Sequence, residues 1–410
     1  MSPSSYKLSE FGASPSDESQ QFFLDRIRQV QPRQATQLEL ATVARILQLR
    51  GRYPSLTIHP LATNQTAKIE EHIEGEFLRS ICRGAIGVFR SYSLGHWDSS
   101  DLYGLMQALV KADIRLTPLR LIRPAFRNTS RADNRTYAEV ALHYDLPVGL
   151  FQRFTFDLTY SAAFMRANPG SIAESTRMTY QTVLQRADLR PRTTVLDLGS
   201  GWGAFARYIQ NATPLHYVGV TISPGQIAWC ASKQFDPGRI HFVEGNLCDS
   251  RTWPRQAGLI TMFESIEHIR SRDRPLLFRE LRMRYPSTSI VLQFTAREGN
   301  LAQARNLSRS VATDLIFTGP SQFPPLRQVL KETRSAGYKV SHIDDLTAEY
   351  SHMALSWYHR FATHESADDH LDPAIGRLWT IYLAATASAL GQRALTNYHV
   401  VLDPTTKGLK

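Results

Sequence analysis

The segment Val195-Leu-Asp-Leu-Gly-Ser-Gly-Trp-Gly-Ala204 joins a short apolar strand to a helix through a loop that holds three glycines. Glycine permits sharp backbone turns and lets a ligand approach the main chain closely. In open parallel sheets, ligands bind beyond the carboxyl ends of the strands. We therefore predict a ligand-binding loop that runs from Asp197 through Gly199 and Gly201 to Gly203.

Strand and helix patterns alternate downstream of this loop. Strands are predicted at 195–198, 216–222, 240–243, 258–263 and 289–295, and helices at 204–210, 225–235 and 274–284. Such alternation, over about a hundred residues, is typical of βαβ units. The predicted fold class is α/β, with a doubly wound and mostly parallel sheet.

The rest of the chain suggests how the domains divide. Residues 1–20 are polar and Ser-rich, and we expect a flexible N-terminus there. Apolar residues recur at helical spacing from Gln21 to Leu49, and the basic polar stretch from Arg127 to Arg135 has the composition of a linker. We predict an N-terminal accessory module at 21–130 and a larger domain at 140–410.

Composition excludes several classes of protein. Hydrophobic residues make up 42% and charged residues 20% of the 410 residues, so wholesale disorder is excluded. The cysteines Cys82, Cys230 and Cys248 have no metal-ligand or redox spacing, and we predict neither a metal site nor a disulfide scaffold. The longest apolar stretch, Leu378 to Leu390, is too short to span a membrane. We expect a soluble, cytoplasmic protein.

The net charge of +10 favours acidic partners. No nucleic-acid motif accompanies it, so no nucleic-acid partner is predicted. The basic run from Leu116 carries Arg120, Arg123 and Arg127, which could contact an anionic membrane and make the protein membrane-peripheral. An ordinary solvated basic face is the alternative, and a homodimer is left open.

The spacing of the glycine loop bears on the ligand. A dinucleotide-binding loop reads GxGxxG, whereas this loop reads GxGxG, and the second strand ends without the acidic residue that binds ribose. The loop resembles the S-adenosylmethionine loop of class I methyltransferases. The segment from Gly219 to Gln226, with Thr221 and Ser223, is similar to the GVTxSxxQ segment of cyclopropane fatty acid synthases and mycolic acid methyltransferases.

Other segments resemble the same family in the same order. They include His143-Tyr-Asp145, Thr159-Tyr-Ser161, and Glu349 to Trp357, and the resemblance extends over about residues 84–401. It implies a seven-stranded sheet with a helical cap, S-adenosylmethionine as cofactor, and an N-terminal module that presents lipid. The cofactor-binding residues that it implies are Tyr160, Ser161, Asp197, Gly199, Gly201, Gly203, Thr221, Gln226 and Asn246.

The resemblance also implies a reaction. In this family the π bond of an alkene in an acyl chain takes the methyl group, and the product is a cyclopropane or a methyl branch. An alkene-type carbon of a lipid or lipid-like molecule is therefore the expected acceptor. A C-, N- or O-methyltransferase of a small secondary metabolite is the alternative, and a non-enzymatic lipid-binding protein is a further one.

A bound bicarbonate ion is the family's proton acceptor. Glu264 and Tyr350 match two residues that hold it, while Ala162 and Gln293 stand where the family has Cys and His. Gln can donate a hydrogen bond but cannot titrate. Glu264, Tyr350 and Gln293 are the predicted catalytic residues, and bicarbonate is the candidate base.

The glutamate assignment has an alternative. Glu267 and His268 could instead match the Glu-His pair of the family, three positions further on. One helical turn would place these side chains on the same face as Glu264, so both could approach the site. His268 is therefore also a catalytic candidate, and a helix-surface position is the other interpretation of it.

Overall fold

The computed structural model describes residues 14–28, 55–58, 67–120, 137–164, 171–187, 189–297, 315–317, 321–363 and 371–406. Its largest feature is a seven-stranded sheet with the strand order β6-β5-β4-β7-β8-β10-β9. The strands are β4 (Thr194–Leu198), β5 (His216–Thr221), β6 (Ile240–Glu244), β7 (Leu259–Phe263), β8 (Ser289–Ala296), β9 (Tyr338–Asp345) and β10 (Thr396–Pro404). The first five pair in parallel, and β10 runs antiparallel to both β8 and β9.

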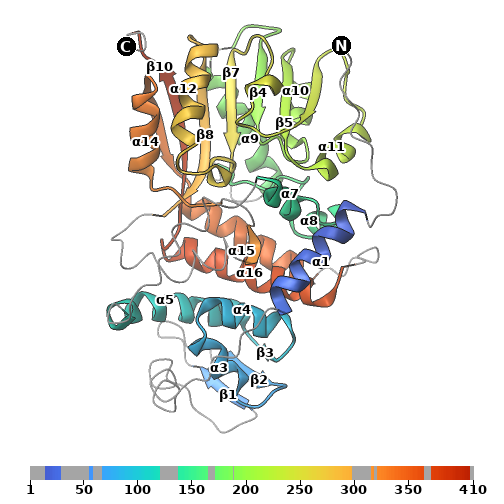
Figure 1. The fold of residues 1–410 in the computed structure, drawn as a ribbon, viewed down its shortest axis with the longest axis vertical. Coiled ribbons are helices and arrows are strands. Elements are labelled where there is room, and N and C mark those ends of the chain that lie inside the picture. The colour runs from blue at the N-terminus through green and yellow to red at the C-terminus, as the bar shows by residue number, and fades with distance from the viewer. Residues whose placement is uncertain are drawn as a thin grey trace.

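Helices cover both faces of this sheet (Figure 1). They are α9 (Ile172–Ala187), α10 (Ala204–Ala212), α11 (Pro224–Ala231), α12 (Arg274–Arg284) and α14 (Leu326–Ser335). Apolar side chains of α12 and α14 pack on one face, and those of α9 and α10 pack on the other. The doubly wound α/β fold is confirmed, and every strand and helix predicted between 195 and 296 is present within a few residues of its expected bounds.

A helical layer lies at the carboxyl ends of the parallel strands, below the sheet in Figure 1. It consists of α7 (Ala138–Tyr144), α8 (Val148–Phe154), α15 (Thr347–Thr363) and α16 (Pro373–Gly391). The apolar stretch Leu378–Leu390 belongs to α16, where most of its side chains are buried in the core. None of the helices in the described segments combines the length and apolar character that crossing a bilayer requires.

The N-terminal elements form a smaller unit beyond α15 and α16 (Figure 1). It contains α3 (Glu76–Cys82), α4 (Ala85–Ser93), α5 (Leu102–Arg120), and an antiparallel sheet of β1 (Ser55–Ile58), β2 (Ala67–Glu71) and β3 (Trp97–Ser99). Arg377 of α16 ties the two units together, since its guanidinium donates to the carbonyl oxygens of Tyr92 and Trp97 and to Asp98. One apolar core runs through both units.

Several sequence predictions fall partly or wholly outside this description. Helix α1 (Pro15–Arg28) begins before the expected start at Gln21, and its Ser19 is buried, so part of the expected flexible N-terminus is helical. The rest of the predicted helix to Leu49 and the linker 127–135 lie outside the described residues, as do the side chains of Arg120, Arg123 and Arg127.

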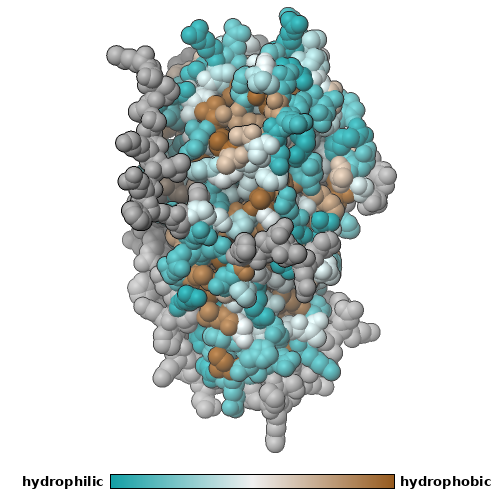
Figure 2. Space-filling view, turned by 90° about the vertical axis from the view of Figure 1, so that its right-hand side faces the viewer, coloured by the Kyte–Doolittle hydropathy of each residue, from teal (hydrophilic) through white to brown (hydrophobic). Residues whose placement is uncertain are grey.

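On the face that Figure 2 shows, apolar side chains form several separate groups among polar ones.

Candidate functional site

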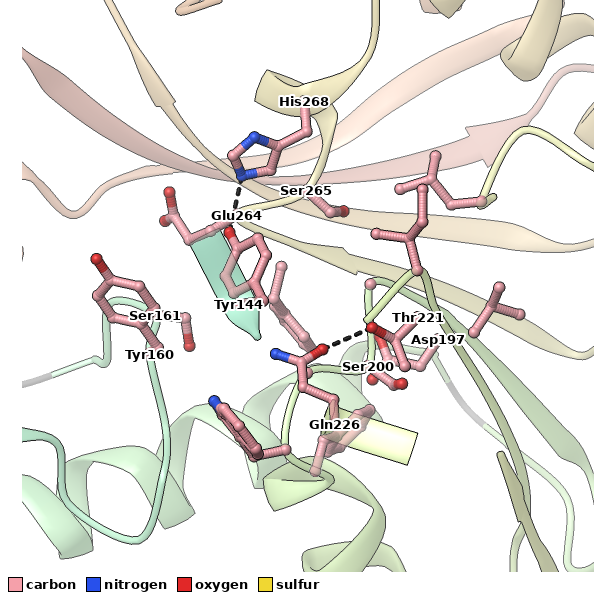
Figure 3. A pocket seen from close by; sticks show the side chains of 18 of the residues that line it. Tyr144, Tyr160, Ser161, Asp197, Ser200, Thr221, Gln226, Glu264, Ser265 and His268 are labelled. Atoms are coloured by element: carbon pink, nitrogen blue, oxygen red, sulfur yellow. Dashed lines mark hydrogen bonds between the residues drawn. The ribbon is translucent and has the colours of Figure 1, made fainter. Parts of the chain in front are cut away.

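Two cavities meet at the carboxyl ends of β4, β5 and β7. The space between their atoms amounts to about 990 Å³ in the first and about 620 Å³ in the second, with the solvent at their mouths included. Tyr144, Tyr160, Glu264 and His268 line both of them. These four side chains therefore form the junction between the cavities, and Figure 3 shows them from the first cavity.

The glycine loop between β4 and α10 forms one wall of the first cavity. At Gly201 the backbone φ is +55°, and a Cβ atom there would meet no atom within 4 Å. The loop is thus open to the cavity at this point, as the ligand-approach argument predicts. At Gly199, with φ +102°, a Cβ atom would lie 2.6 Å from the Cβ of Ser265, so glycine is required for packing.

The structure corrects the role predicted for Gly203. This residue does not line the first cavity and instead precedes helix α10 with φ +77°. A Cβ atom there would lie 3.1 Å from both the sulfur of Cys230 and the ring of Phe242. Its glycine serves the left-handed turn into the helix and close packing, because the turn directs it away from the cavity.

Polar side chains line the cavity beside this loop. Thr221, at the end of β5, donates from its hydroxyl to Oε1 of Gln226 at 2.5 Å. This bond holds the side chain of Gln226 in the wall and leaves its amide nitrogen as a donor, as Figure 3 shows. Both residues are buried and line the first cavity, so the structure brings them together as the sequence predicts.

Asp197, at the end of β4, is buried in the same cavity wall. Its carboxylate accepts hydrogen bonds from the hydroxyls of Tyr217 at 2.6 Å and Thr261 at 2.8 Å. Burial nevertheless raises the pKa of Asp197 to about 6, because the charged form loses its solvation. This carboxyl is thus the acidic group on the floor of the cavity.

The remaining predicted cofactor residues also lie here. Tyr160, Ser161 and Asn246 line the first cavity. The lining residues that were not predicted include Tyr137, under the guanidinium of Arg270, and Ser200. The buried Ser200 hydroxyl has no hydrogen-bond partner among the described residues, which suits a polar ligand.

These features fit S-adenosylmethionine. They line one cavity at the carboxyl ends of the parallel strands, where open α/β sheets bind ligands. An open glycine, an acidic carboxyl, an amide donor and a free hydroxyl line it, and they match the cofactor's ammonium, hydroxyl and carboxylate groups chemically. Asp197, Gly201, Thr221, Gln226 and Asn246 are the residues that would hold it.

The second cavity has a different wall. Phe317, Phe323, Leu390 and Leu395 supply apolar surface. The phenol rings of Tyr160, Tyr350 and Tyr382 complete this wall, and the hydroxyls of Tyr160 and Tyr382 lie 3.0 Å apart. Such a wall suits a ligand with a substantial apolar part.

Glu264 occupies the junction in an unusual backbone conformation, with φ +48°. Its carboxylate accepts hydrogen bonds from Asn397 Nδ2 at 2.5 Å and Thr295 Oγ1 at 2.8 Å, and Gln293 Nε2 lies 3.5 Å away. Asn397 and Thr295 are register partners on β10 and β8, so the antiparallel pair of strands inside the sheet holds this carboxylate. Asn397 was not predicted, because its burial follows from the pairing of β10 with β8 and no local sequence pattern marks it.

Glu267 lies beside Glu264, so the structure brings both glutamates of the two alignments to the site. Its side chain is buried, lines the second cavity, and accepts from the backbone amide of Thr295. Burial and the neighbouring Glu264 carboxylate raise the pKa of Glu267 well above its usual range. The charged form of Glu267 is thus disfavoured beside Glu264.

His268 follows on the same short 3₁₀ turn (Ile266–His268) and is buried rather than on a helix surface. Its Nε2 lies 2.8 Å from the Tyr144 hydroxyl, and its Nδ1 lies 2.7 Å from the Ser321 hydroxyl. Burial lowers the pKa of His268 to about 4, so the ring is neutral. It thus bridges α7 and the wall of the second cavity as a neutral imidazole.

The structure separates the two remaining catalytic candidates. Tyr350 lines the second cavity, as its predicted role requires. Gln293 lines neither cavity, and its Nε2 donates to the carbonyl of Ala162 at 2.9 Å. Gln293 therefore supports Glu264 from behind, because β8 directs its side chain toward the Ala162 backbone.

Comparisons with known proteins point to one family. A family model described as mycolic acid cyclopropane synthetase matches residues 131–400. Tuberculostearic acid methyltransferase UfaA1 of Mycobacterium tuberculosis is 27% identical over 383 residues, which cover 88% of this chain and 89% of that protein. Cyclopropane-fatty-acyl-phospholipid synthase of Escherichia coli K12 is 23% identical over 358 residues, which cover 84% of this chain and 90% of that protein.

Solved structures share the fold. The cyclopropane synthase MmaA2 from Mycobacterium tuberculosis superposes with a TM-score of 0.59 at 19% identity, covering 66% of this chain and 99% of that one. The mycolic acid cyclopropane synthase CmaA1, in complex with SAH and CTAB, gives a TM-score of 0.60 at 18% identity, covering 65% and 98%. The share of this chain that these two structures cover is similar in size to the seven-stranded sheet together with its helical layer.

Proposed function

Since the chain belongs to the mycolic acid cyclopropane synthetase family, and is thus an S-adenosylmethionine-dependent methyltransferase, we propose that it methylates an alkene carbon in the acyl chain of a lipid. The product is a cyclopropane or a methyl branch. One observation carries the proposal: a cavity suited to the cofactor opens, at Tyr144, Tyr160, Glu264 and His268, into a second cavity with an apolar wall. The relatives named above act on fatty acyl chains according to their names, which supports the same acceptor class here.

The aromatic side chains at the junction have a role in this chemistry. S-adenosylmethionine supplies an electrophilic methyl group when it is bound. An alkene carbon that takes this methyl leaves a positive charge on its neighbour, and the faces of aromatic rings stabilise nearby cations. Tyr160 lines the junction and Tyr350 lines the second cavity, so we expect both rings near such a charge, and Trp357 packs against both of them. The apolar core around them would also keep water from quenching the charge.

The character of the second cavity bears on the metabolite alternative. An N- or O-methyltransferase must accommodate a polar nucleophile, whereas Phe317, Phe323, Leu390 and Leu395 give one part of this cavity an apolar wall beside its tyrosines and carboxyl groups. An acyl chain satisfies such a wall better. Contact of Arg120, Arg123 and Arg127 with an anionic membrane, and a homodimer, stay predictions.

The proposal is tested by incubating the purified protein with S-adenosylmethionine and phospholipids that carry a monounsaturated chain. Mass spectrometry should find acyl chains heavier by one CH₂. The saturated lipid of the same headgroup is the matched control and should give no product. Methyl transfer only to oxygen or nitrogen of added metabolites would overturn the acyl-chain acceptor.

Loss of a proton from the methylated chain requires a base, and the family resemblance suggests bicarbonate. Ala162 offers no side chain for it, and the Gln293 amide already donates to the Ala162 carbonyl. Thr295 Oγ1 and Asn397 Nδ2 already donate to Glu264. The resemblance implies four positions around the ion, namely Ala162, Glu264, Gln293 and Tyr350. Of these, only Tyr350 has a hydroxyl left to donate to a new anion.

Charge opposes bicarbonate as well. Glu264 lines the second cavity, and an anion beside its carboxylate is unfavourable when the donors that would offset the repulsion are already engaged. The residues present therefore do not fit bicarbonate, and no step is assigned to it here.

A further inference from the structure

The misfit of bicarbonate raises the question of which group takes the proton, and the answer rests on the proposed function. The base must reach the methyl group at the point where the cofactor cavity opens into the acceptor cavity. Among the residues that line both cavities in the described structure, Glu264 is the one with a carboxylate. Tyr144, Tyr160 and His268 are the others, and burial makes the phenols weak acids and the imidazole a weak base.

The backbone of Glu264 supports a specific role for its side chain. A non-glycine residue at φ +48° is strained, and such strain gathers at functional sites. The backbone amide of Glu264 donates to the Gln293 carbonyl at 2.7 Å, which holds the strained turn at the end of β7. This turn directs the carboxylate into the junction.

Neighbouring donors also fix the orientation of the Glu264 side chain. Asn397 and Thr295 donate to its two oxygens, which holds the carboxylate at the junction. Burial and the Glu264 carboxylate raise the pKa of the neighbouring Glu267, which disfavours a second charge beside Glu264. Of the two carboxyl groups, the one on Glu264 faces both cavities.

We propose that the Glu264 carboxylate is a base built into the chain, which acts in place of a bound bicarbonate. The alkene π electrons form the new C–C bond as the C–S bond breaks, with its electron pair going to sulfur. Glu264 then takes one proton from the transferred methyl group. The electron pair of the broken C–H bond then joins the former methyl carbon to the cationic carbon, which closes a cyclopropane. Alternatively, a hydride first shifts so that the positive charge moves to the carbon that bears the methyl group. The same electron pair then forms a double bond between that carbon and the former methyl carbon. Glu264 leaves this step as a neutral acid and returns its proton to solvent before the next turnover.

The test uses Glu264→Gly, because glycine suits φ +48° and removal of the side chain opens room for a small anion. Methyl transfer to the monounsaturated phospholipid is measured in decarbonated buffer, with bicarbonate or formate then added. Wild-type protein should be insensitive to either ion. Glu264→Gly should lose at least tenfold in rate without an added anion and recover at least fivefold with bicarbonate or formate.

Two further variants sharpen the result. Glu264→Gln keeps the shape of the side chain but cannot take a proton, so we expect a loss of at least tenfold with no recovery by added anion. Glu18→Gln, an exposed position on α1, is the matched control and should behave as wild type. Calorimetry of S-adenosylmethionine binding and a thermal unfolding curve should show each variant folded and able to bind the cofactor.

The outcomes separate the two proposals. A wild-type enzyme that methylates the alkene only when bicarbonate is present, or a Glu264→Gly variant as fast as wild type in decarbonated buffer, overturns the built-in base and leaves the proposed function standing. A wild-type protein that binds S-adenosylmethionine but methylates no alkene lipid overturns the proposed function, and the base assignment falls with it.

Discussion

At Gly201 the main chain faces the first cavity without any side chain in between. A valine there would project into the space that the cofactor needs, so we expect Gly201→Val to weaken S-adenosylmethionine binding at least tenfold, measured by calorimetry. Part of any effect is strain, because φ is +55° and a left-handed backbone costs an L-residue about 1–2 kcal/mol.

A second glycine separates strain from occupancy. Gly95, in the N-terminal unit, has φ +73° and would also meet no atom within 4 Å of a Cβ. Gly95→Val should therefore lose similar stability in urea unfolding while binding the cofactor as wild type does. Equal cofactor affinity in both variants would place the cofactor away from Gly201.

The pKa of Asp197 makes a prediction about pH. In the folded chain it is raised to about 6 by burial, whereas an unfolded Asp titrates near about 3.9. The folded state therefore holds the extra proton between these values, so the contribution of Asp197 is fully present below about pH 4 and is lost as pH rises through 6. Between pH 4.5 and 7.5 this amounts to about 2 kcal/mol.

Asp197→Asn removes that titration. Urea unfolding at pH 4.5 and 7.5 should show that the wild-type protein loses about 2 kcal/mol more than the variant over this range. The comparison between the two proteins cancels the other titrating groups. If the difference between wild type and variant is the same at both pH values, the folded pKa of Asp197 is close to its unfolded value.

At the scale of elements, helix α16 has two tasks. Its residues Tyr382, Thr386 and Leu390 line the second cavity, and its Arg377 holds the N-terminal unit through two backbone carbonyls and Asp98. Hydrogen bonds from charged groups contribute about 1.5–3 kcal/mol each, and partial exposure of Arg377 reduces this.

We expect Arg377→Met to lower the free energy of unfolding by about 2–4 kcal/mol, since two carbonyls lose a charged donor. Cofactor affinity should not change, because Arg377 lies outside the first cavity. Urea unfolding and calorimetry check both points. A loss below about 0.5 kcal/mol would show that apolar packing alone attaches the N-terminal unit.

The elements between 195 and 296 were predictable because each has a local signal. Apolar runs of strand length, a glycine turn and amphipathic helices follow one another there, and tertiary contacts only reinforce them. The strand β10 has no such signal at its start, where Thr396 and Asn397 are polar but buried. Its pairing with β8 joins residues about a hundred positions apart, which single-sequence patterns do not encode.

At the scale of the whole molecule, the candidate site shows the same division. The residues of the glycine loop, Thr221 and Gln226 were predictable, because motif and cavity coincide within a single βαβ unit. Gly203 and Gln293 occupy the expected motif positions. What surrounds Gly203 and where the Gln293 side chain points follow from the tertiary packing. The Glu264 environment joins β7, β8 and β10, and only the assembled sheet brings these together.

The assembled molecule keeps the two cavities functionally separate except at their junction. Leu390, on α16, is 1% exposed and lines the second cavity but not the first. The residues that line the first cavity include none from α16. A larger side chain at position 390 should reduce the room for the acceptor in the second cavity without changing the walls of the first cavity.

We expect Leu390→Phe to lower methyl transfer to long acyl chains more than to short ones, with unchanged affinity for S-adenosylmethionine. Added volume in a packed core costs about 1–3 kcal/mol, so lost stability must be separated from lost space. Leu383 lies on the same helix, is also 1% exposed and lines neither cavity, which makes Leu383→Phe the matched control. Both variants should unfold at lower urea concentration than wild type, but only Leu390→Phe should change the ratio of rates on long and short chains. The same ratio in both variants would mean that the acyl chain does not occupy the second cavity.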